Sequence, residues 1–152
     1  MSPSPDLFHQ DILLSLARII GNYLETNPLG KVAIAPSDVC LTDLNVYQPD
    51  FYFVSNARKS ILTEQGAEGA PDLVAEILSP RTARFDKGIK REVYARTGVK
   101  ELWIIDPLLR QIQVYRLTES ADVPAATLGE EQQLESPLLP GLRIPVEKIF
   151  RR

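Results

Sequence analysis

The chain has little of what would point to a secreted protein or a metal-thiolate protein. Its 152 residues include one cysteine, one histidine, one tryptophan and one methionine. Because the single thiol of Cys40 cannot form an internal disulfide, the simplest interpretation is a protein of a reducing compartment. The sequence also lacks zinc-ligand spacing, a Walker loop and a nucleophile elbow, so it gives no support for a zinc site, a P-loop nucleotide site or an α/β-hydrolase triad.

Long hydrophobic runs are lacking too. The most apolar stretch near the start, ILLSLARII, is nine residues long and contains Arg18, so it is too short and too interrupted to cross a bilayer. The preceding segment MSPSPDLFHQD is polar and proline-rich rather than positively charged, and no small-residue cleavage site follows the apolar stretch. We therefore expect a soluble, cytoplasmic protein with no membrane partner.

What is present is ordinary globular composition. Hydrophobic residues make up 44% of the chain and charged residues 24%, so a real core can form. The length fits one domain over residues 1–152.

Hydrophobic spacing predicts a helix, three strands, a second helix, and then two or more strands. A helix over 6–26 begins at Asp6 as its cap, and a second helix ends at Gly98 after placing Phe85, Ile89 and Val93 on one face. The predicted strands cover 31–41 with a kink at Pro36, then 45–55, 72–79, 101–106, 111–117 and 128–136. Residues 56–70 should be a loop with one helical turn, and the tail 139–150 should pack back on the sheet.

This order predicts a mixed α/β sheet with helices packed against it. A helix between the third and fourth strands indicates a crossover and therefore a parallel pair of strands. No glycine-rich turn joins a strand to a helix, so the doubly wound nucleotide-binding fold is excluded.

A carboxylate interrupts the predicted strand 72–79. Alternation places Asp72, Val74, Glu76 and Leu78 on one face, and an ionised carboxylate is costly to bury unless it is paired or binds a metal. Three partners for Glu76 are open. One is Asp50, on the strand expected alongside, through a shared Mg²⁺; the second is Lys90; the third is Asp72, about 13 Å away along an extended strand.

Plain structural roles stand beside these chemical ones. An arginine of the next helix would satisfy Glu76 as a salt bridge, and Asp72 would cap a turn before its strand.

The window 81–100 carries seven basic and two acidic side chains, a charge of +5 that leaves −8 for the rest of the chain. Such a window is either a binding surface for a polyanion or a solvated helix face. The basic residues are Arg81, Arg84, Lys87, Lys90, Arg91, Arg96 and Lys100.

The stretch PDLVAEILSPRTARFDKGIKREVYARTGVKELWIIDP resembles the signature of the Uma2 family of candidate endonucleases. The resemblance continues through HQDILLSLARIIGNYL and VYQPDFYFV upstream and through IQVYRL and LPGLRI downstream, and so covers nearly the whole chain. The family is grouped with the PD-(D/E)xK nucleases. The resemblance implies a single restriction-endonuclease-like domain over 1–152, an αβββαβ core with extra C-terminal strands, and hydrolysis of DNA phosphodiester bonds with Mg²⁺ or Mn²⁺.

The resemblance also implies roles for particular residues. Asp50 and Glu76 match the family's two acids and would hold the metal. The superfamily usually has a lysine two residues after the second acid, where this chain has Leu78, so Lys90 would supply the catalytic amine from the next helix. Residues expected to contact the nucleic-acid backbone are Arg81, Arg84, Lys87 and Arg91.

Three further residues are accessory candidates. Asp72 matches a recurrent family residue. Tyr94 lies one turn after Lys90 and either lines the same cleft or packs. His9, the one histidine, either moves a proton near pH 7 or caps and packs the start of its helix.

A non-catalytic binding or assembly module that keeps the nuclease fold is the alternative. It is favoured by Leu78 in the lysine position and by the start of the chain at MSPSP, because many family members begin earlier, with a hairpin that carries a glutamate. A component of a mobile or defence system, in which a partner supplies DNA specificity, is a third candidate. A two-fold homodimer is the expected assembly if both strands of DNA are cut.

Overall fold

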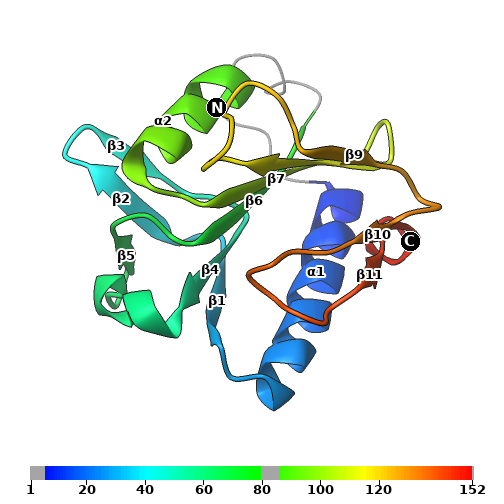
Figure 1. The fold of residues 1–152 in the computed structure, drawn as a ribbon, viewed down its shortest axis with the longest axis horizontal. Helices are drawn as coiled ribbons and strands as arrows, with labels where there is room; N and C mark the ends of the chain where they lie inside the picture. Colours follow the sequence, from blue (N-terminus) through cyan, green and yellow to red (C-terminus); the bar gives the residue numbers. More distant parts are fainter. Residues whose placement is uncertain (1–5, 80–85, 152) are drawn as a thin grey trace.

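A six-stranded mixed sheet forms the centre of the structure, a computed structural model that describes residues 6–79 and 86–151 (Figure 1). The strand order is β1-β4-β6-β7-β8-β9. The strands β6 and β7 are parallel, whereas the other neighbours are antiparallel. The strands are β1 (Gly30–Ile34), β4 (Phe51–Ser55), β6 (Leu73–Ile77), β7 (Glu101–Asp106), β8 (Gln111–Arg116) and β9 (Ala126–Leu128).

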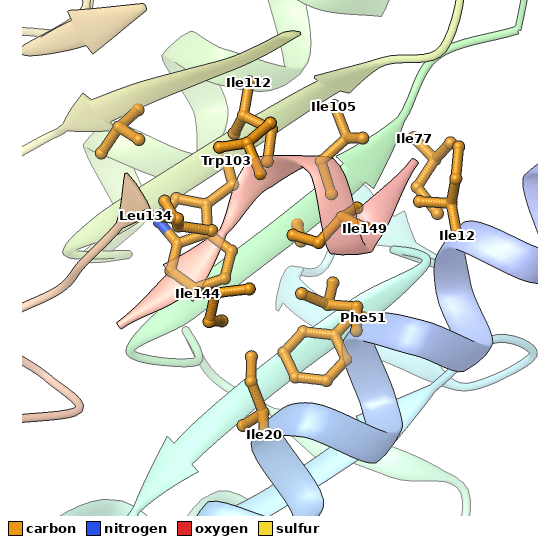
Figure 2. Packing of buried hydrophobic residues seen from close by; sticks show 14 of the residues in the cluster. Ile12, Ile20, Phe51, Ile77, Trp103, Ile105, Ile112, Leu134, Ile144 and Ile149 are labelled. Carbon is orange, nitrogen blue, oxygen red and sulfur yellow. The ribbon is translucent and has the colours of Figure 1, made fainter. Parts of the chain in front are cut away.

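Helix α1 (Leu7–Thr26) covers one face of this sheet. It begins where predicted, because the Asp6 carboxylate accepts a hydrogen bond from the His9 backbone N–H at 2.7 Å. Its apolar stripe of Ile12, Leu16 and Ile20 is fully buried. Figure 2 shows Ile12 and Ile20 reaching Phe51 and Ile77 of the sheet. Burial of this stripe holds the start of α1 in a fixed place above the sheet.

The C-terminal tail packs against the same core, so its predicted place on the sheet is confirmed. Two short strands pair there, β10 (Gln133–Leu134) and β11 (Ile144–Pro145), followed by the one-turn helix α3 (Val146–Ile149). Ile144 and Ile149 are buried and pack against Trp103 of β7 (Figure 2).

Helix α2 (Asp86–Thr97) lies on the opposite face of the sheet (Figure 1). The connection β6–α2–β7 is the predicted crossover, with Gly98 at a φ of 109° just past the helix. Val93 and Tyr94 are buried, but Ile89 is 67% exposed, so the predicted inner face is wrong at Ile89. Phe85 lies outside the described residues. The inner face is therefore turned toward Tyr94, a shift that brings a phenol to the sheet.

Two predicted strands are each divided between two sheets. Residues 31–41 form β1 and β2 (Asp38–Thr42), and residues 45–55 form β3 (Asn45–Tyr47) and β4. Pro36 and Pro49 fall at these breaks, and a proline cannot donate a ladder hydrogen bond. The second sheet has the order β3-β2-β5, with β5 (Gly66–Glu68) inside the predicted loop.

Of two smaller predictions, one is confirmed and one is wrong. The helical turn predicted in the loop is the 3₁₀ helix η1 (Asn56–Ile61). The single strand predicted over 128–136 is wrong, because β9 ends at Leu128 and β10, in another sheet, begins at Gln133. Within residues 6–79 and 86–151 no helix is both long and apolar enough to cross a membrane.

Asp72 joins three strands at the beginning of β6. Its side chain is fully buried, with one carboxylate oxygen accepting the Ser55 N–H at 2.7 Å and the other bound by the Lys100 ammonium at 3.0 Å. Its backbone N–H donates to the Phe53 carbonyl, and its own carbonyl accepts from the N–H groups of Lys100 and Glu101. Burial would raise the pKa of Asp72, but the hydrogen bonds from Ser55 and Lys100 outweigh it and hold that pKa below its usual value.

We predict that Asp72→Ala destabilises the fold by about 2 kcal/mol, because it leaves the partly buried Ser55 N–H without its acceptor. Since the pKa is lowered, the carboxylate stabilises the folded state above its ordinary pKa, and this stabilisation is lost as the pH falls through the lowered value. Urea unfolding of the variant, with the exposed Asp43→Ala as control, measures the effect. An Asp72→Ala protein as stable as wild type would contradict the structural role.

Candidate active site

The strand register brings Asp50 and Glu76 to the same end of the sheet. Phe51 pairs with Ala75 and Tyr52 with Val74, and continuing this antiparallel register by one residue sets Asp50 opposite Glu76. Directly opposed residues have Cβ atoms roughly 4.5–5.5 Å apart. The predicted adjacency of these two strands is confirmed. Asp50 and Glu76, called the acid pair below, are therefore close neighbours.

Asp50 is held from two sides. One carboxylate oxygen lies 3.1 Å from Nε2 of His9 at the start of α1. The other accepts the backbone N–H of Ile77 at 2.7 Å. The hydrogen bond to Asp50 raises the pKa of His9, against the opposing effect of burial. His9 thus takes part in the cap of α1 through its backbone N–H and contacts the first acid through its side chain, where the sequence left its role open.

Glu76 points toward α2 and exposes 12% of its side chain. Its Oε2 accepts the Tyr94 hydroxyl at 2.8 Å and lies 3.6 Å from the Lys90 ammonium. Lys90 and Tyr94 are four residues apart, so one face of the helix presents both. Of the partners considered for Glu76, the structure brings Lys90 and Asp50 to it and leaves Asp72 at the other end of β6.

Burial raises the pKa of Glu76, and the negative charge of Asp50 adds to the rise. The Lys90 ammonium and the Tyr94 hydroxyl act in the opposite direction. Burial also raises the pKa of the Tyr94 phenol, as does the adjacent Glu76. Tyr94 therefore stays protonated and donates its hydrogen bond to the carboxylate.

Tyr47 is a neighbour of this site that the sequence analysis missed. The Lys90 ammonium lies 5.4 Å from the centre of its ring, and the Tyr47 and Tyr94 rings meet edge to face at 5.6 Å. The position of Tyr47 three residues before Asp50 gave no signal, because the chain leaves one sheet after Tyr47 at the end of β3 and enters the other at β4, just past Asp50.

The chemistry of the acid pair fits a hard divalent cation. Mg²⁺ is commonly held by one or two carboxylates, with water and substrate phosphate completing its coordination. Among the described residues no group of three or more His, Cys, Asp or Glu side chains could hold a metal ion. The acid pair could thus contribute two carboxylates and would leave the remaining positions to water and substrate.

The residues expected to bind nucleic acid are seen only in part. Arg81 and Arg84 lie outside the described residues, as does the side chain of Lys87. Arg91 is described, and its guanidinium lies 4.8 Å from the centre of the Tyr115 ring while Nη1 donates to the Tyr115 hydroxyl at 3.2 Å. Leu78, in the expected lysine position, is half-buried against the apolar cluster under α2.

We predict that Glu76→Gln raises the stability of the protein at about pH 7 by about 1 kcal/mol, because the raised pKa means that the folded protein disfavours the charged carboxylate even with Lys90 beside it, and glutamine keeps an oxygen for Tyr94. A raised pKa stabilises the folded state below the ordinary pKa of glutamate, and this contribution is lost as the pH rises through the raised value. Urea unfolding at several pH values measures both effects, with the exposed Glu92→Gln on α2 as control. Strong destabilisation by Glu76→Gln would contradict this prediction.

We predict that His9 stabilises the metal-free protein more at acidic than at alkaline pH. Its raised pKa makes the contribution full below the ordinary pKa of 6.5 and absent above the raised value. The gap in unfolding free energy between wild type and His9→Gln should therefore be larger at about pH 5.5 than at about pH 8.5, by about 1 kcal/mol. An equal gap at both pH values, measured in EDTA, would show that the pair is not coupled.

Comparisons with known proteins agree on the kind of fold. The family model for Uma2, described as "Putative restriction endonuclease", matches residues 1–147. The chain is also similar to a crystal structure of "a putative nuclease belonging to DUF820" from Anabaena variabilis, with a TM-score of 0.78, 19% identity and coverage of 99% of this chain and 84% of that one. No curated protein matches. At that identity the similarity of the solved structure concerns the fold, which is nuclease-like as expected. With nearly its whole length matched by the family model, the chain belongs to the Uma2 family.

Proposed function

We propose that the protein is a Mg²⁺- or Mn²⁺-dependent endonuclease that hydrolyses DNA phosphodiester bonds. The observation that carries the proposal is the placement of Glu76: a mostly buried carboxylate, opposite Asp50 in the strand register and 3.6 Å from the Lys90 ammonium. Two acids and an amine from three separate segments meet at one end of the sheet. Membership of a family whose description is "Putative restriction endonuclease" supports the same activity.

Each side chain has a definite task in this mechanism. Asp50 and Glu76 would hold the cation, with His9 and the Ile77 N–H fixing Asp50 and Tyr94 fixing Glu76. When bound, a divalent cation supplies Lewis acidity toward a water molecule and the scissile phosphate. Lys90 would orient the attacking water or donate to a phosphate oxygen, where a fixed positive charge favours the transition state.

The basic segment 81–100 would bind the phosphate backbone. Its charge of +5 on an otherwise acidic chain supports salt-sensitive binding with little sequence preference. We assign this contact to Arg81, Arg84, Lys87 and Arg91. We also assign the protein to the cytoplasm, because a single cysteine suggests a reducing compartment. A homodimer would place two such sites on the two strands of a duplex.

A non-catalytic module that keeps the nuclease fold is the alternative, and the ion pair between Lys90 and Glu76 favours it. A carboxylate that already has an ammonium and a phenol as partners is satisfied without a metal. The absence of a lysine at Leu78 points the same way. Binding of DNA without cleavage distinguishes this alternative from the enzyme.

We predict that supercoiled plasmid is cleaved with Mg²⁺ or Mn²⁺ and stays intact with EDTA. Asp50→Asn, Glu76→Gln and Lys90→Met should each lower the rate by about 10²-fold or more, because each removes a charge that acts on the transition state. Glu92→Gln and Lys59→Met remove exposed charges of the same kinds and should cleave like wild type. Cleavage that survives both EDTA and Glu76→Gln would rule out this site, and salt-sensitive binding without cleavage would establish the non-catalytic alternative.

A further inference from the structure

The second sheet, β3-β2-β5, contributes an aromatic ring, that of Tyr47, to the candidate site. Tyr47 belongs to β3 and pairs with Val39 of β2, which is fully buried. Its ring lies 5.4 Å from the Lys90 ammonium, within the distance of about 6 Å at which a ring face attracts a cation. We propose that Tyr47 is a positioning residue that holds the Lys90 ammonium beside Glu76, an inference that rests on the proposed function and deepens it.

A positioning residue is needed because the Lys90 amine is carried by α2 and not by the strand of Glu76. A lysine at position 78 would start just past the end of β6, the strand that carries Glu76. This chain has Leu78 there, and its amine instead arrives from α2 at the end of a flexible four-carbon stem. Glu76 contacts the end of that stem from β6, 3.6 Å from the ammonium. The Tyr47 ring adds a contact from β3, a different element, and so restricts the stem further.

The ring is itself well supported. Tyr47 meets Tyr94 at an interplanar angle of 77°, the edge-to-face arrangement that aromatic pairs prefer. Tyr94 is fully buried and donates to Glu76 at 2.8 Å. The contacts thus form a closed set in which Tyr47, Lys90, Glu76 and Tyr94 each touch two of the others. A change in Tyr47 would therefore act on Lys90 first, since Tyr94 keeps its own hydrogen bond.

Two substitutions separate the ring from the hydroxyl and from simple packing. Tyr47→Phe keeps the ring face, whereas Tyr47→Leu fills similar space without one. The order parameter of the Lys90 ε-methylene group, from ¹³C relaxation with Lys90→Met used for assignment, should be alike in wild type and Tyr47→Phe. It should fall in Tyr47→Leu toward that of the exposed Lys59. An unchanged order parameter in folded Tyr47→Leu would overturn the proposal, whether or not the protein cleaves DNA.

Cleavage kinetics supply the second arm. Tyr47→Leu should lower kcat by about tenfold or more with KM nearly unchanged, because a misplaced catalytic group costs rate rather than binding. Tyr47→Phe should stay close to wild type. In the Lys90→Met background, Tyr47→Leu should have no further effect, since the two residues act through one group. Multiplying effects would overturn the proposal, whereas a wild type that fails to cleave would overturn the proposed function and leave the order parameter to decide the role of Tyr47.

Discussion

The structure of this site depends on one constraint: the carboxylate of Glu76 lies near the end of β6, an interior strand of the sheet, where water reaches 12% of its side chain. An anion there must be compensated by partners placed by the fold. Helix α2 supplies Lys90 and Tyr94 from one face, whereas the residue just before β4, Asp50, is a second acid rather than a cation. Placing Asp50 opposite Glu76 raises the energy of the charged site, an arrangement that stability alone would not favour and that a bound cation would relieve.

The acids Asp72, just before β6, and Glu76, near its end, show how two carboxylates at the two ends of one strand take different roles. Asp72 is sealed by Ser55 and Lys100, and its pKa is lowered. Glu76 has a raised pKa despite its partners. The first carboxylate is fully satisfied by the folded chain and holds strands together, whereas the second retains an electrostatic demand. That contrast separates a structural acid from a candidate functional one.

Much of this could be predicted from the sequence, because it rests on local periodicity. Alternation along the strand put Glu76 on one face with Val74 and Leu78, which is the face that α2 covers in the structure, and the helix between two apolar strands gave the parallel pair β6–β7. What failed depends on contacts between distant segments. The division at Pro36 and Pro49 sends β2 and β3 to a second sheet, and only that sheet brings Tyr47 to Lys90. The contact between His9 and Asp50 likewise joins residues 41 apart, so helical spacing gave it no signal.

The central claim is that Asp50 and Glu76 share a divalent cation, and direct metal binding tests it without reference to cleavage. Titration of the protein with Mn²⁺, following the signal of the free ion by electron paramagnetic resonance, measures that binding. The shared site predicts saturable binding in wild type and in the exposed control Glu68→Gln, and its loss in both Asp50→Asn and Glu76→Gln. Saturable binding that is equal in all four proteins, or absent from the wild type, would contradict it.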